Sequence, residues 1–117
     1  MVTIDDVRSL ASTLPRTTEG LTRDRVKFRI GRIVYLAFSA DEKLMGFAFP
    51  KEEREALIGS EPHKFLMPPV SDQRYNWVVV GLREIDAAEM YELVVDAWRM
   101  CVPKSVAADW QDGDHVG

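Results

Sequence analysis

The sequence predicts a two-layer α+β sandwich in which helices cover one face of an antiparallel sheet. Segments with helical periodicity lie near both ends of the chain, and segments with strand character lie between them. The connections between the first strands are too short for parallel crossovers. The expected order of elements is α-β-β-β-α-β-β-α.

Length and composition fit one globular domain. The chain has 117 residues, 46% of them hydrophobic, which is enough for a single core. We expect one domain over residues 1–110 and a flexible tail over 111–117, where no periodicity is visible. The lack of a long apolar run, the absence of a signal peptide at Met1 and the single cysteine, Cys101, predict a cytoplasmic protein.

The first helix is predicted over residues 4–14, because apolar residues recur there every third or fourth position. Thr3 and Asp6 have the spacing of a capping box, and Pro15 is expected to end the helix. The polar residues 16–24 are expected to form a loop.

Three strands are predicted to form an antiparallel meander, over 25–30, 33–38 and 44–49. Apolar and basic residues alternate in the first, whereas the other two are continuous apolar runs. Gly31 and Arg32 have the pattern of a two-residue hairpin turn with glycine first.

A short helix is predicted over 51–58, between Pro50 and Gly59, which are typical residues at the start and just past the end of a helix. Residues 63–67 and 77–82 are predicted strands, and the second is rich in β-branched residues.

The last helix is predicted to run to Cys101 and to bury a wide apolar face. Asp86 is its expected N-cap, and Glu89 occupies the third helical position, where a carboxylate suits the helix start. Pro103 is expected to follow the end of the helix.

Several segments, taken in order, resemble the MmcQ/YjbR-like proteins from about Thr3 to Trp110. The matching pieces are Leu14-Pro15, Thr18-Glu19, Val26–Gly31, Trp77–Val80, Ala97–Arg99 and Pro103-Lys104. The resemblance implies a two-layer fold similar to frataxin-like and type III secretion chaperone-like proteins. It also implies DNA binding by a "double wing" sheet, and it supplies no catalytic residues.

Basic residues recur at alternate positions along the first predicted strand, which places them on one face if the strand is regular. The candidate nucleic-acid contacts are Arg23, Arg25, Lys27, Arg29, Arg32, Lys64, Arg74 and Tyr75. Neutralising four to six phosphates predicts a salt dependence with a slope of roughly −4 to −5. Alternatively, basic residues on an outer strand protect a sheet edge from aggregation, which Asp24 and the net charge of −4 favour.

The strands over 33–38, 44–49 and 77–82 are apolar at both alternating positions, although few helices are available to cover two faces. Some of these residues are therefore expected to face away from the core, against a second subunit, a peptide or a small molecule. The candidates for this partner surface are Tyr35, Phe47 and Trp77. We expect a homodimer.

Catalytic and metal-binding patterns find little support. His63 and His115 are the only histidines, and no nucleophile elbow or glycine-rich phosphate loop is present. Cys101 near a helix C-terminus is expected to be a structural thiol. Asp112, Asp114 and His115 in the predicted tail are poorly preorganised for a metal ion. We therefore expect no catalytic residues, no cofactor and no metal.

The expected function is that of a non-enzymatic binding protein, with DNA as the named candidate. Two alternatives remain open at this point. One is a chaperone-like or adaptor protein that binds a protein partner through an apolar sheet face. The other is a small-molecule-binding protein with a pocket between the sheet and the last helix.

Overall fold

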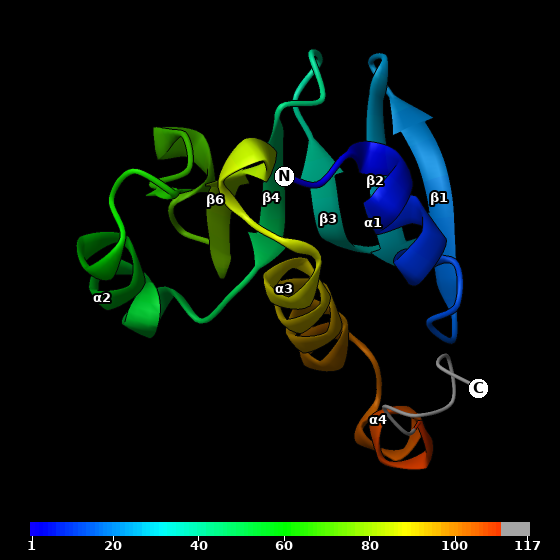
Figure 1. The fold of residues 1–117 in the computed structure, drawn as a ribbon. Coiled ribbons are helices and arrows are strands. Elements are labelled where there is room, and N and C mark those ends of the chain that lie inside the picture. Colours follow the sequence, from blue (N-terminus) through cyan, green and yellow to red (C-terminus); the bar gives the residue numbers. More distant parts are fainter. Residues whose placement is uncertain (111–117) are drawn as a thin grey trace.

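The computed structural model describes residues 1–110, in which helices pack on one face of an antiparallel sheet. Its elements are α1 (Ile4–Ala11), β1 (Thr17–Thr22), β2 (Arg25–Ile30), β3 (Ile33–Phe38), β4 (Leu44–Ala48), α2 (Lys51–Ser60), β5 (Phe65–Leu66), η1 (Val70–Asp72), β6 (Trp77–Gly81), η2 (Leu82–Glu84), α3 (Ala87–Cys101) and α4 (Lys104–Asp109). Figure 1 shows α1 and α3 in front of the sheet and α2 beside it. The expected tail over 111–117 lies outside the described residues.

The sheet has six strands in the order β1-β2-β3-β4-β6-β5, and all neighbours are antiparallel. This confirms the predicted α+β class. The expected loop over residues 16–24 is wrong, because β1 pairs with β2 along its full length. Arg23 and Asp24 both take left-handed backbone conformations, with φ of 55° and 64°, and make the two-residue hairpin turn without a glycine.

The helix starts follow the local sequence signals. The Thr3 hydroxyl accepts from the backbone N–H of Asp6 at 3.3 Å, and the Asp6 carboxylate accepts from the N–H of Thr3 at 2.9 Å. The Asp86 carboxylate accepts from the N–H of Glu89 at 2.8 Å. Both caps match the prediction, since short polar side chains satisfy the free N–H groups of a first turn.

The helix ends differ from the prediction. The first helix stops at Ala11, three residues earlier than expected, and α2 continues through Gly59 to Ser60. A further short helix, α4, follows Pro103. Glycine lowers helix stability only modestly, so a helix can continue past it when its other residues favour helix.

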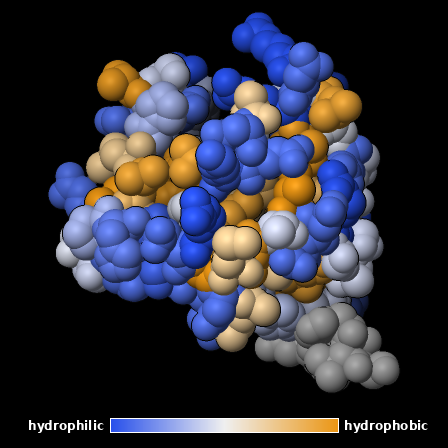
Figure 2. Space-filling model, turned by 45° about the horizontal axis from the view of Figure 1, so that its top comes forward, coloured by the Kyte–Doolittle hydropathy of each residue, from blue (hydrophilic) through white to orange (hydrophobic). Residues whose placement is uncertain are grey.

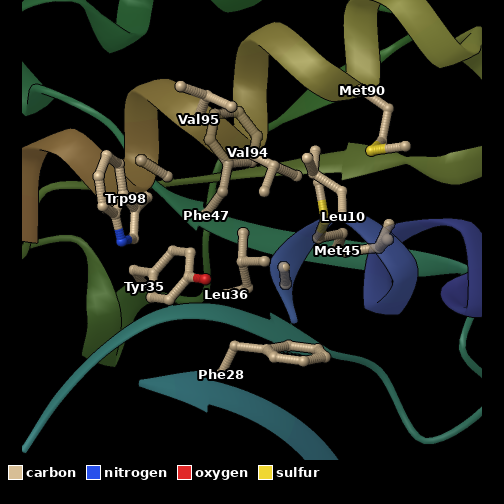
Figure 3. Packing of buried hydrophobic residues seen from close by; sticks show 14 of the residues in the cluster. Leu10, Phe28, Tyr35, Leu36, Met45, Phe47, Met90, Val94, Val95 and Trp98 are labelled. Carbon is tan, nitrogen blue, oxygen red and sulfur yellow. The ribbon is translucent and has the colours of Figure 1, made fainter. Parts of the chain in front are cut away.

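The core lies between the sheet and the two helices α1 and α3, as Figure 3 shows. Tyr35 and Phe47, expected on an outward surface, are both fully buried there. A β-bulge between β2 and β3 makes Tyr35 an extra residue, which places it on the helix-covered face together with Leu36. Phe47 pairs directly with Leu36 and therefore points the same way. The partner-surface prediction is wrong for these two residues.

Two buried aromatic side chains hold the start of β1 against this core. The Tyr35 hydroxyl is 2.8 Å from the Thr17 hydroxyl oxygen, and the Trp98 indole N–H donates to the carbonyl of Pro15 at 2.9 Å. Glu19 on β1 also pairs with Arg8 of α1 at 2.9 Å. These contacts explain how a polar segment forms a strand, since aromatic residues that are buried usually find partners for their polar tips.

Stability at alkaline pH should depend on Tyr35. Burial raises the pKa of Tyr35 from 10.0 to about 12, so the unfolded state loses this proton first as the pH rises. The stabilisation of the folded state that this pKa difference provides is fully present below about pH 10 and is lost progressively between about pH 10 and 12. We expect Tyr35→Phe to lose about 1 kcal/mol at pH 8, through the missing hydrogen bond, and to show a shallower alkaline loss than the wild type. Urea unfolding from about pH 8 to 11.5 measures both; parallel pH profiles in the two proteins would contradict this assignment.

Candidate nucleic-acid interface

The face of the sheet opposite α1 and α3, called the outer face from here on, is mostly exposed among residues 1–110. Directly paired residues share a face, so the strand register identifies its members. They are Thr18, Gly20, Thr22, Arg25, Lys27, Arg29, Val34, Ala37, Leu44, Gly46, Ala48, Leu66, Trp77, Val79 and Gly81. All except Gly46 and Ala48 are exposed or half-buried, whereas the residues that alternate with them on β2, β4 and β6 are buried.

Three cations on β2 form a row on this outer face. Arg25, Lys27 and Arg29, here named the basic strip, stand at alternate positions. The guanidinium of Arg29 lies 3.4 Å from the hydroxyl of Thr22, and no ion pair among residues 1–110 involves the strip. A row of cations that form no ion pairs produces a positive local potential even on an acidic chain.

Edge protection does not explain the basic strip. The interpretation requires the basic residues to lie on an edge strand. In the structure β2 is hydrogen-bonded on both sides, to β1 and to β3, and the edges of the sheet are β1 and β5. The basic side chains therefore cover an interior strand.

The other basic candidates are not part of the strip. Arg23 and Arg32 are exposed in the turns at opposite ends of β2, and the positive φ of Arg23 ends the alternation there. Lys64 is not in this row, and its ammonium pairs with Glu61 at 2.8 Å and with Glu89 at 2.9 Å. Hydrogen bonds to these two carboxylates raise the pKa of Lys64 above its ordinary value.

Aromatic side chains lie near the start of β6. The guanidinium of Arg74 is 4.8 Å from the ring centre of Tyr75 and donates to its hydroxyl at 2.8 Å. Trp77 faces outward as expected, and its indole occupies the space above Gly46. A Cβ atom added to Gly46 would lie 2.5 Å from the Trp77 Nε1 atom, so the contact requires glycine.

A clamp formed by α2 fixes the loop that leads into β6, and the sequence analysis missed it. The buried guanidinium of Arg54 donates to the carbonyls of Gln73, Tyr75 and Trp77 at 3.0 to 3.3 Å. The carbonyls between them accept from the Lys51 ammonium and from the Phe49 backbone N–H, both at 3.2 Å. Five consecutive carbonyls are therefore satisfied from α2 and the segment before it, which holds the loop in one conformation.

The remaining residues considered for catalysis or metal binding are Cys101, Asp112, Asp114 and His115. Burial raises the pKa of the half-buried Cys101 thiol, which keeps it protonated. Among residues 1–110, no group of three or more His, Cys, Asp or Glu side chains is placed to hold a metal ion. Asp112, Asp114 and His115 lie outside the described residues. No helix in the described part of the chain is long and apolar enough to cross a membrane.

Two hollows lie away from the outer face. One, of about 370 Å³, is lined by residues that include Met1, Ile4 and Leu82. Figure 2, which turns the upper end of Figure 1 toward the viewer, shows hydrophobic residues gathered between hydrophilic ones. The second hollow, of about 320 Å³, lies between the end of β4, α2 and α3, with Phe49 and Met100 in its lining. Both volumes are at the small end for ligand pockets.

The fold and the site define a class of protein: a two-layer α+β domain with an open antiparallel sheet face that carries a row of cations. The family model described as YjbR matches residues 12–100, and the chain belongs to the YjbR family.

Curated relatives and a solved structure are also similar to this chain. The uncharacterized proteins Rv2570 of Mycobacterium tuberculosis and Mb2600 of Mycobacterium bovis are each 29% identical over 134 residues, covering 91% of this chain and 93% of theirs. The crystal structure of Deinococcus radiodurans protein DR2400, with a DUF419 domain, is similar with a TM-score of 0.75 and 21% identity. That match covers 99% of this chain and 87% of the other, and it shows the shared fold.

Proposed function

We propose that this protein is a non-enzymatic binding protein that holds nucleic acid on its outer face. The observation that carries the proposal is the basic strip, Arg25, Lys27 and Arg29, on an interior strand and without ion pairs among residues 1–110. Contacts between cations and phosphates supply much of the affinity in such complexes and fix the register of the bound chain.

The spacing of the strip suits a phosphate backbone. Alternate residues of an antiparallel strand lie about 6.8 Å apart, which is twice the axial rise of ~3.4 Å per nucleotide. The side chains opposite the strip are small: Thr18, Gly20 and Thr22 on β1, with Val34 and Ala37 on β3. A backbone can therefore approach the cations from either side.

Gly20 offers a direct test, because it lies opposite Lys27 on the outer face. No atom lies within 4 Å of a Cβ added there, and its backbone is not left-handed. A larger side chain at this position thus projects into open space beside the strip without disturbing the core.

We expect Gly20→Glu to weaken nucleic-acid binding by about tenfold or more, because the new carboxylate pairs with Lys27 and repels phosphates. Gly20→Thr, a matched substitution without charge, should change affinity by less than about threefold. Fluorescence anisotropy with a labelled mixed-sequence oligonucleotide measures both, and thermal unfolding checks that both variants fold. Equal affinity of Gly20→Glu and the wild type would contradict the proposal.

A further inference from the structure

We infer that the outer face takes single-stranded rather than duplex nucleic acid, with its phosphates on the basic strip and an unstacked base against Trp77. The inference rests on the proposed function and adds the form of the ligand.

A row of mostly small residues connects the strip to Trp77 across the outer face. Successive pairing partners from β1 to β5 form this row: Gly20, Lys27, Ala37, Gly46, Val79 and Leu66. The Trp77 indole lies above Gly46, in the same row. The indole lies over β4, which two strand spacings of about 4.8 Å separate from β2, so the row of cations and the indole lie about 10 Å apart. One flexible strand can contact both.

The Trp77 ring is held on the surface rather than in the core. Trp77 is half-buried, on a face that neither α1 nor α3 covers. An aromatic ring that covers a glycine on a neighbouring strand also stabilises a sheet, which is the structural explanation of this contact. That explanation applies to the ring surface against Gly46, and the exposed part of the indole remains available to a ligand.

The α2 clamp preorganises a second aromatic residue. Tyr75 is 52% exposed and carries the guanidinium of Arg74 against its ring. Since the carbonyls of this loop are all held, Tyr75 and Trp77 lose little further freedom on binding. Aromatic side chains beside a positively charged surface are the usual components of sites that bind single strands.

The shape of the face disfavours a duplex. Six strands span about 24 Å, whereas the major groove of B-DNA is about 12 Å wide and admits a helix or a two-stranded ribbon. A sheet this broad cannot enter the groove to contact base edges. Bases in a duplex also stack on one another, so only a single strand presents a base face to Trp77.

The test compares labelled single-stranded DNA, single-stranded RNA and duplex DNA of the same mixed sequence at one salt concentration. We expect the wild type to bind at least one single strand about tenfold more tightly than the duplex. Trp77→Leu should weaken single-strand binding by about 5- to 150-fold, the range for the loss of one stacked base, and change duplex binding less than about twofold. Tyr75→Ala should act in the same direction with a smaller effect, and its exposed position avoids a folding defect.

Failure of this inference is distinguishable from failure of the proposed function. Equal binding of single strands and duplex, unchanged in Trp77→Leu but weakened in Gly20→Glu, would overturn the single-strand inference and leave nucleic-acid binding intact. An equal loss for single strands and duplex in both Trp77→Leu and Tyr75→Ala would also overturn it, because stacking acts on single strands alone. No binding of any of the three probes would overturn both proposals.

Discussion

Reversing two charges of the basic strip, with Arg25→Glu and Arg29→Glu together, is expected to weaken nucleic-acid binding by about a hundredfold or more. The two carboxylates replace phosphate contacts with repulsion. The free energy of unfolding should change by less than about 1 kcal/mol, because Arg25 is exposed and the 3.4 Å contact of Arg29 with Thr22 is weak. The change also removes the repulsion between these two cations and Lys27.

A matched control separates local from overall charge. Arg83→Glu with Lys104→Glu produces the same change in net charge at exposed positions outside the basic strip. We expect this control to change affinity by less than about threefold at about 0.15 M salt, where charges beyond ~8 Å are screened. Anisotropy gives the affinities, and urea unfolding gives the stabilities. A similar loss of binding in both double variants would show that the basic strip has no special role.

Replacing Arg54 by methionine is expected to destabilise the fold by about 2–4 kcal/mol. Methionine retains much of the apolar stem but leaves the carbonyls of Gln73, Tyr75 and Trp77 without their donor. Arg54→Lys should have an intermediate effect, because an ammonium keeps the charge but lacks the planar fork that reaches all three oxygens.

Urea unfolding of Arg54→Met beside Glu55→Met tests the clamp. Glu55 is the exposed neighbour on α2, so placing methionine there controls for the new residue type and should cost less than about 0.5 kcal/mol. If the two variants lose the same stability, the hydrogen bonds of Arg54 do not hold the loop. If they differ as expected, single-strand binding should also fall in Arg54→Met, because the loop then no longer fixes Trp77.

The parts of the fold that local signals determine could be predicted from the sequence. Caps at Thr3 and Asp86, the hairpin turn at Gly31 and the alternation of cations on β2 each depend on neighbouring residues, and the structure contains all of them. The positive φ of Gly31 matches the expected glycine-first turn. The alternation was sufficient to identify the three residues of the basic strip.

The rest depends on contacts between distant segments. β1 has little apolar alternation, and it forms because Thr17 and Glu19 find partners on β3 and α1. Tyr35 turns inward because of a bulge, which shifts the alternation by one residue. Lys64 is neutralised in part by a carboxylate from α3, and Arg54 binds backbone carbonyls, which any sequence has. None of these partners is visible in a local pattern.

The salt dependence of nucleic-acid binding by the wild-type protein shows whether the basic strip binds phosphates. With three cations on the outer face, we expect micromolar affinity at about 50 mM salt and a slope of log affinity against log salt of about −2 for a single strand, or about −3 for a duplex. This is shallower than the slope expected when all the basic candidates act together. No binding at ~100 μM protein, or an affinity unchanged between about 50 and 200 mM salt, would contradict a phosphate-binding role for Arg25, Lys27 and Arg29.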